Sequence, residues 1–150
     1  MARNALRALL RPAAGESGGV LVEAALVIPL VLAVAFGVVM AGRIAHAQVG
    51  VGAVAREAGR TLAQAPSAHA GLAGARERAL AVADGHGLEA AELELVLEAG
   101  AFRRGGTVRA RASYRVALGD LPLYGLIEVT VRSTHRERVE LYRGRATALP

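Results

Sequence analysis

The main feature of the hydrophobic pattern is a long apolar stretch near the N-terminal end of the chain. Residues 24–42 are 19 consecutive residues without a charge, and residues 20–22 extend the stretch on the other side of Glu23. A helix over residues 20–41 would be about 33 Å long, which matches the roughly 30 Å hydrocarbon core of a bilayer. The pattern therefore predicts a transmembrane helix, which we place at residues 19–42.

Beyond this segment, helical periodicity continues and then gives way to alternation. Apolar residues recur at helical spacing as far as Gln64, where Pro66-Ser67 closes the helix, and residues 68–83 form a second helical pattern. Alternating apolar and polar residues then predict three strands and a short fourth one. The predicted strands are residues 93–97, 108–118, 127–133 and 139–142.

These elements predict an α+β fold of the pilin-like plan, in which a transmembrane helix continues outside the membrane and leads to a small antiparallel sheet of three or four strands. Glutamates on the first strand and arginines on the second would face each other in an antiparallel pair. Residues 100–106 would form the hairpin loop between them. The predicted organisation is a basic cytoplasmic leader (1–18), the transmembrane helix (19–42), an extracytoplasmic helical segment (43–88) and a small antiparallel β domain (89–150).

The distribution of arginines predicts the orientation of the span. Arg3, Arg7 and Arg11 precede it, whereas Arg43 and Arg56 follow it. The positive-inside rule therefore favours a cytoplasmic N-terminus, with the C-terminal domain outside the cytoplasm. We expect a single-pass protein of the cell membrane.

A cleavable secretory signal is the alternative explanation of the apolar stretch. Ala45-His46-Ala47 fits an A-x-A cleavage site before Gln48. However, the uncharged run is longer than the roughly 7 to 15 residues of a signal, and Arg43 lies between the run and that site. A retained span is the favoured interpretation.

Composition excludes several classes of chemistry. The chain of 150 residues has no cysteine, so it has neither a disulfide nor a thiolate metal site. Its four histidines lack the spacing of a metal site, and the G-x-S-x-G match at residues 15–19 precedes a membrane span rather than following a strand. All 18 basic residues are arginines, but aromatic residues are only 3% of the chain, so few rings are available to stack nucleic-acid bases. We predict no catalytic residue, cofactor or metal, and consider nucleic acid an unlikely partner.

The residues before the span carry a second signal. Gly18 is followed five residues later by Glu23, at the start of an apolar helix and after a short basic leader. This arrangement resembles the type IV prepilin processing motif, which implies that a prepilin peptidase cuts between Gly18 and Gly19. We expect an extended backbone at this bond, where no side chain obstructs a protease. Alternatively, the glycines are a flexible joint and Glu23 is an interfacial acid.

Two features of the span suggest contact with other helices. An ionisable group costs up to about 2.5–3.5 kcal/mol at mid-span and less near an end, so Glu23 calls for a partner, and the freed amine of an adjacent subunit is the candidate. Ala33, Gly37 and Ala41 form a row of small residues at intervals of four, which lets helices approach closely. In a chain so rich in alanine, chance is a competing explanation of this row.

Together these motifs are similar to those of the TadE-like family of tight-adherence pilus proteins. The first 60 residues carry most of the resemblance, through Val22-Glu23-Ala24-Ala25, Ile28-Pro29-Leu30, Gly42-Arg43 and Ala55-Arg56-Glu57-Ala58-Gly59-Arg60. The strand, proline turn and strand around Leu121-Pro122-Leu123 also resemble the family. The resemblance implies a pseudopilin or minor pilin without enzymatic activity, with the membrane, a prepilin peptidase and other pilin-like subunits as partners. The alternative is an unprocessed single-span protein whose outer domain binds an anionic ligand or a partner protein.

Overall fold

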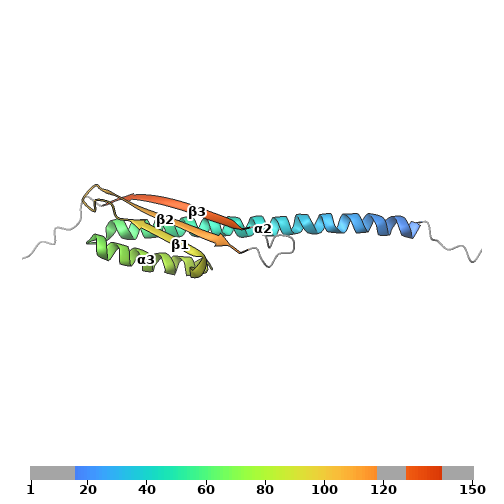
Figure 1. Ribbon diagram of the computed structural model, residues 1–150, viewed down its shortest axis with the longest axis horizontal. Coiled ribbons are helices and arrows are strands. Elements are labelled where there is room, and N and C mark those ends of the chain that lie inside the picture. The colour runs from blue at the N-terminus through green and yellow to red at the C-terminus, as the bar shows by residue number, and fades with distance from the viewer. Residues whose placement is uncertain (1–15, 118–127, 140–150) are drawn as a thin grey trace, which may run out of the picture. The chain divides into compact units, whose positions relative to one another are not determined.

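The computed structural model describes residues 16–117 and 128–139 (Figure 1). Two helices, α2 (Glu16–Gln64) and α3 (Ala68–Gly85), are followed by a short 3-10 helix η1 (Ala90–Glu92). Three strands complete the described part, namely β1 (Leu93–Glu98), β2 (Thr107–Val116) and β3 (Val129–Arg138). Residues 118, 127 and 140–142 of the predicted strands lie outside the described residues, and Ala117, Glu128 and Val139 are described but lie outside β2 and β3.

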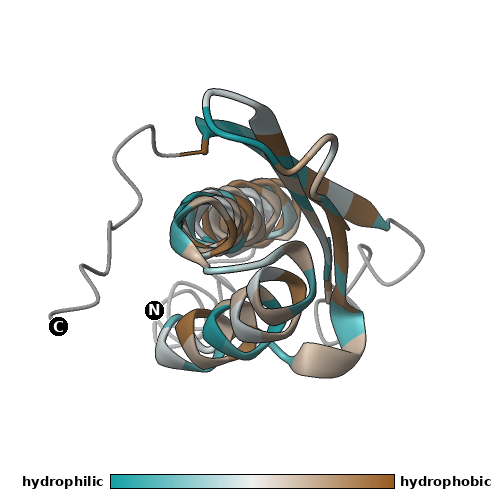
Figure 2. Cartoon of the chain, turned by 90° about the vertical axis from the view of Figure 1, so that its left-hand side faces the viewer, coloured by the Kyte–Doolittle hydropathy of each residue, from teal (hydrophilic) through white to brown (hydrophobic). Residues whose placement is uncertain are grey.

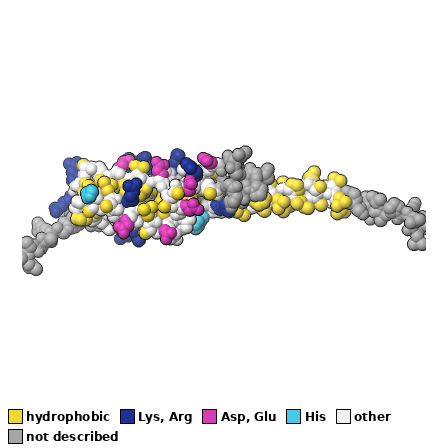
Figure 3. Space-filling view, turned by 60° about the horizontal axis from the view of Figure 1, so that its bottom comes forward, with side chains coloured by type: hydrophobic (Ala, Val, Ile, Leu, Met, Phe, Trp, Pro, Cys, Tyr) yellow, Lys and Arg dark blue, Asp and Glu magenta, His cyan; other side chains and the backbone are white. Residues whose placement is uncertain are grey.

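The chain divides into two units, Met1–Val39 and Met40–Pro150, and α2 contributes to both. Over Gly19–Gln64 the helix is long and apolar enough to cross a membrane, and none of its most apolar 18-residue window is buried within the described chain. Hydrophobic side chains cover this part of α2 in Figure 3. An apolar surface of this extent needs a non-aqueous environment or a partner, which agrees with the predicted transmembrane helix.

The second unit is a three-stranded sheet with helices on one face. The strand order is β1-β2-β3, and both neighbouring pairs are antiparallel. Figure 2 shows α2 and α3 on the same face of the sheet. Alternate side chains of β2 are buried on that face, and the others lie on the opposite face, here called the open face. The predicted α+β fold is confirmed.

Small side chains form most of the core of this unit. On α3 the buried residues recur at every fourth position, as Gly71, Ala75, Ala79 and Ala83. Alanines at 110 and 112 are fully buried on β2, and the only buried aromatic side chain among the described residues is that of Tyr114. Small side chains at these positions let the helices lie close to each other and to the sheet. The fully buried larger side chains are Leu62, Val51, Val54, Val108 and Val139.

The turn between α2 and α3 is held by a helix cap and a close contact. The Ser67 hydroxyl accepts a hydrogen bond from the Ala70 amide at 3.2 Å, which satisfies one of the free donors at the start of α3. One turn further on, a Cβ atom at Gly71 would lie 2.9 Å from the Cβ of Ala65 and 2.9 Å from Cδ1 of Leu62. Only glycine therefore fits there without displacing a neighbour.

We expect Gly71→Ala to destabilise the second unit, although alanine is the better helix former. Overpacking typically costs about 1–3 kcal/mol, against a gain of roughly 1 kcal/mol in helix propensity. Gly74→Ala is the matched control in the same helix, because its new Cβ would meet only Cγ2 of Thr61, at 3.7 Å. Thermal unfolding in detergent should give a lower midpoint for the first variant and an equal or higher one for the second. Equal midpoints for both variants would contradict the close contact at Gly71.

The third strand differs from its prediction. β3 continues to Arg138, five residues beyond the predicted end at residue 133. The following residue, Val139, donates to the carbonyl of Gly106 at 2.8 Å and accepts from the amide of Gly105 at 3.1 Å. These bonds fasten Val139 to the predicted hairpin loop, and the described part of the sheet has three strands.

Candidate processing and assembly site

The predicted processing residues lie at the beginning of α2. The helix starts at Glu16, so Gly18 and Gly19 belong to its first turn. Our expectation of an extended backbone at this bond is therefore wrong for this structure. The first amides of a helix have no partner within the helix, and helix ends fray, so the bond lies in the part of α2 that is easiest to unwind.

Glu23 lies one helical turn beyond Gly19 on the same helix. Residues four apart on a helix are neighbours on one face, and helical side chains lean toward the N-terminus. The Glu23 side chain is exposed among exposed apolar neighbours. If the chain began at Gly19, a new amine would lie about one turn from this carboxylate, at the positive end of the helix dipole.

The predicted row of small residues is not buried by the described part of the chain. Ala33, Gly37 and Ala41 are all unburied, and a Cβ added at Gly37 would meet nothing within 4 Å. The same holds for Gly19 and Gly42. No contact among the described residues requires glycine at these positions.

Glycines in the outer part of α2 are different. A Cβ at Gly50 would lie 3.0 Å from Cδ1 of Leu88, and one at Gly59 would lie 3.0 Å from Cδ2 of His135. Both glycines are buried against other elements of the second unit. Gly50 and Gly59 are thus explained by contacts within the chain. Gly37 and Gly42, in or next to the apolar part, meet no neighbour among the described residues.

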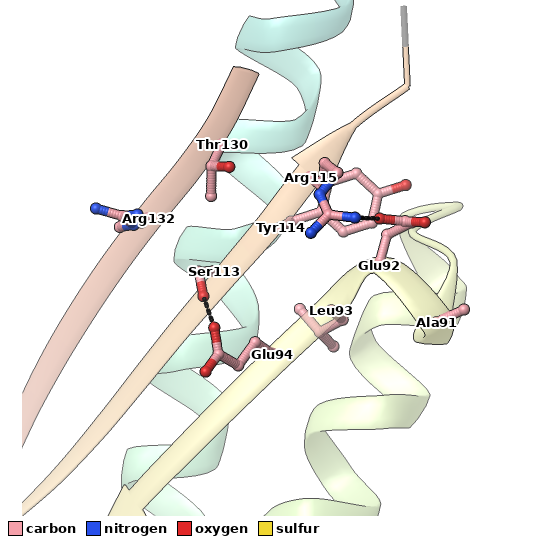
Figure 4. A pocket seen from close by; sticks show the side chains of 9 residues that line it. All are labelled: Ala91, Glu92, Leu93, Glu94, Ser113, Tyr114, Arg115, Thr130 and Arg132. Carbon is pink, nitrogen blue, oxygen red and sulfur yellow. Dashed lines mark hydrogen bonds and ion pairs between the residues drawn. The ribbon is translucent and has the colours of Figure 1, made fainter. Parts of the chain in front are cut away.

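The open face of the sheet carries charged side chains from all three strands. Arg109 on β2 lies 3.0 Å from Glu98 on β1, and Arg115 lies 3.6 Å from Glu92. Glu94 accepts a hydrogen bond from Ser113 at 3.1 Å. Figure 4 shows Glu92, Glu94, Ser113 and Arg115 around a polar hollow of about 290 Å³ that Thr130 and Arg132 of β3 complete. The pairing of glutamates with arginines across β1 and β2 follows the sequence prediction.

This hollow lacks the groups of a hydrolytic site. Three hydroxyl groups line it, on Ser113, Tyr114 and Thr130; that of Ser113 is bonded to a carboxylate, and no histidine is among the described lining residues to act as a base. Within residues 16–117 and 128–139, no cluster of three potential metal ligands occurs. His46 contacts the carbonyl of His86 at 3.0 Å, and His135 lies 3.0 Å from Glu137, so these two imidazoles have separate local partners.

A single exposed apolar helix that continues into a helix-backed antiparallel sheet is the architecture of a pilin-like membrane protein. A family model described as TadE-like protein matches residues 18–60, so the predicted resemblance is confirmed over this segment. The matched residues begin at the proposed junction, include the apolar helix and end with the Ala-Arg-Glu-Ala-Gly-Arg segment. Comparison with curated proteins and with solved structures gives no match. The similarity to the TadE-like family is limited to this segment.

Proposed function

We propose that the protein is a TadE-like pseudopilin or minor pilin, a structural or assembly component of a tight-adherence pilus or a related secretion apparatus. It would be anchored by residues 19–42, with a cytoplasmic N-terminus and the outer domain outside the cytoplasm. A prepilin peptidase would cut between Gly18 and Gly19. The observation that carries the proposal is the family match over residues 18–60, which covers the junction and the whole apolar helix.

The uncovered surface of α2 supports an assembly role. Large apolar side chains from Val20 to Val39 are exposed, and Gly37 among them meets no atom of the described residues that would explain a glycine there. In lipid, small residues on a helix surface promote close packing with other helices, because apolar side chains alone gain little by leaving the lipid. Ala33, Gly37 and Ala41 would form such a surface for neighbouring pilin-like subunits, with Glu23 docking on the amine of one of them.

Cutting after Gly18 would serve this assembly. It would remove Arg3, Arg7 and Arg11, whose charges hold the N-terminus on the cytoplasmic side. The remaining helix would carry one carboxylate and one amine near its start. Pairing the carboxylate of one subunit with the amine of the next lowers the cost of burying both charges in a bundle. No catalytic function of this chain is needed.

The intact mass of the membrane-extracted protein tests the processing step. We expect a chain that begins at Gly19, and we expect Gly18→Leu to leave the chain at full length because a bulky residue obstructs the protease. Ala45→Leu is the matched variant for secretory cleavage, since it changes the exposed first residue of the A-x-A site. It should not alter processing. A product that begins at Gln48, or an uncut wild-type chain, would overturn the proposed processing.

Secretory cleavage before Gln48 is the less favourable alternative on structural grounds. Ala47 is only 3% exposed, and α2 continues without interruption through this site. The side-chain amide of Gln48 donates to the carbonyl of Arg132 on β3 at 3.2 Å. Cleavage there would cut a helix that the outer domain uses for its own core.

A further inference from the structure

The two edges of the sheet carry opposite charges on the open face. On β3, alternate side chains from Thr130 to Arg138 lie on that face, and three of them are arginines. On β1, the open face carries Glu94, Val96 and Glu98. β3 and β1 are the two outer strands of the described sheet, so each has one side without a strand partner there. Unpaired strand edges bind other strands unless they are covered or blocked.

The arginines of β3 lack compensation within the described chain. Arg132 and Arg136 are exposed, and neither forms an ion pair with an acidic side chain of the described residues. Arg136 lies directly opposite Arg109 in the register of β2 and β3. Like charges at directly opposed positions destabilise a sheet, and Arg109 already uses Glu98. An additional carboxylate beside Arg136 would therefore stabilise the sheet.

The acids of β1 can take a second partner. The contacts of Glu94 and Glu98 within the chain both use the atom Oε2, bonded to Ser113 and Arg109 respectively. An ionised carboxylate has about four acceptor positions on its two oxygens. Both side chains are at least partly exposed, Glu98 to 44%. The acidic edge therefore keeps acceptors for an incoming arginine.

We infer that β3 of one copy pairs with β1 of a second copy, which extends the sheet from molecule to molecule. Pairing of two β3 edges would bring arginines together, and pairing of two β1 edges would bring glutamates together. Only the mixed pair of edges joins opposite charges. The occupant of the β3 edge is thus the β1 strand of another copy of this chain.

The backbone determines the direction of this pairing. The amide and carbonyl of Val139 point toward the β2 side. Because these groups alternate along a strand, those of the even-numbered residues of β3 point to its free edge. The hydrogen bond from Gln48 to the carbonyl of Arg132 agrees with this direction. By the same alternation, Leu95 and Leu97 direct theirs to the free edge of β1. With the open faces aligned, these groups match only in a parallel ladder. There Thr134 would lie opposite Val96 of the second copy and bond to the leucines on either side of it.

Charge then selects one register. Arg132 and Arg136 are four residues apart on β3, and Glu94 and Glu98 are four apart on β1. If each β3 residue lies opposite the β1 residue whose number is 38 lower, Arg132 lies opposite Glu94 and Arg136 lies opposite Glu98. An offset of 36 leaves no such pair, and an offset of 40 leaves one within the two strands, Arg138 with Glu98. The carbonyl of Arg132 keeps its bond to Gln48, because a carbonyl oxygen accepts two hydrogen bonds.

This pairing suits repeated assembly. β1 and β3 run in the same direction, since both are antiparallel to β2. A parallel β3–β1 contact therefore joins copies that have the same orientation, as copies inserted in one membrane do, and in this respect it rests on the proposed function. The contact is heterologous, so each added copy presents a free edge for the next.

Disulfide cross-linking of full-length chains in their membrane tests the contact, because the wild-type chain has no cysteine. Co-expressed Thr134→Cys and Val96→Cys chains, carrying different tags, should form a mixed disulfide on mild oxidation, since neighbouring strands place the two Cα atoms within bonding range. The pair Arg132→Cys and Glu94→Cys should also cross-link. Thr134→Cys with Ala73→Cys, an exposed position on α3, is the control and should not. Cross-linking of Thr134→Cys chains to each other would overturn the proposal.

Charge exchange provides the second arm. In the Thr134→Cys and Val96→Cys pair, R132E on the β3 partner should reduce the mixed disulfide about fivefold, and E94R on the β1 partner should restore it without disturbing the Glu98–Arg109 pair. Loss without restoration would overturn the pairing and point to an anionic polymer on the arginines instead. A chain that is cut after Gly18 but does not cross-link refutes only this inference. An uncut chain that cross-links refutes only the processing.

Discussion

Leu62→Ala is expected to lower the free energy of unfolding of the second unit by about 2–5 kcal/mol, the usual cost of removing a large side chain from a core. Leu62 is fully buried near the end of α2, and its Cδ1 atom lies where α3 approaches most closely at Gly71. Gly71 and Ala65 lie beside it, and neither has a side chain that can rearrange to fill the space. Hydrogen exchange of the β2 amides reports this opening, because the membrane part of α2 does not need to unfold. Exchange should accelerate roughly 30-fold to a few thousandfold.

Leu80→Ala is the control for this experiment. Leu80 lies on α3 and is 44% exposed, so the same truncation leaves no enclosed cavity. It should change exchange of the β2 amides by about threefold or less, in line with the small effect of surface substitutions. Equal acceleration by the two variants would mean that the contact of α2 with the sheet and α3 is not the stabilising core of this domain.

Local sequence signals predicted the helices well because their ends are marked by local chemistry. Pro66-Ser67 ends α2 and supplies the cap of α3, and both events depend on residues adjacent in sequence. The long apolar run likewise needed no distant information. These features depend on backbone geometry and on transfer of side chains out of water, which act on each segment separately.

The length of β3 could not be predicted in this way. After Val131 its residues on the helix side are Ser133, His135 and Glu137, so the hydrophobic alternation that identifies a strand stops. Ten residues of β3 are nevertheless paired with β2. His135 is accommodated because α2 has a glycine, Gly59, where it approaches. The polar part of β3 depends on its pairing with β2 and on the space that Gly59 of α2 leaves for His135. Its own sequence carries no signal of either.

Glycines of α2 were equally ambiguous in the sequence. Helix propensity predicts that Gly50 weakens the helix, yet α2 passes through it without a break and Leu88 packs against it from 38 residues away. For the candidate site, local signals did not show that Gly18–Gly19 is helical. The opposite charges of the two sheet edges could be recognised only from the strand register. Alternation alone does not show which arginines already have glutamate partners.

Glu23→Ala is expected to reduce incorporation into pilus or secretion assemblies by at least tenfold, while membrane insertion stays intact. A charge-assisted hydrogen bond contributes about 1.5–3 kcal/mol, and the amine of a neighbouring helix would lose its partner. In a lone span the same change removes an unfavourable charge from apolar surroundings, so insertion should be unimpaired. The measurement is the ratio of assembled to membrane-pool protein after mild cross-linking, with the processed N-terminus determined on the same sample.

The choice of variants separates docking from other roles of this carboxylate. Glu23→Gln keeps the size but not the charge and should resemble the alanine variant, whereas Glu23→Asp keeps the charge and should retain part of the assembly. Glu77→Ala, which removes an exposed acid from α3, is the matched control and should assemble normally. A binding module anchored by an unprocessed span would be indifferent to all four changes. Normal assembly of Glu23→Ala would therefore remove the docking role and leave the apolar helix as an anchor only.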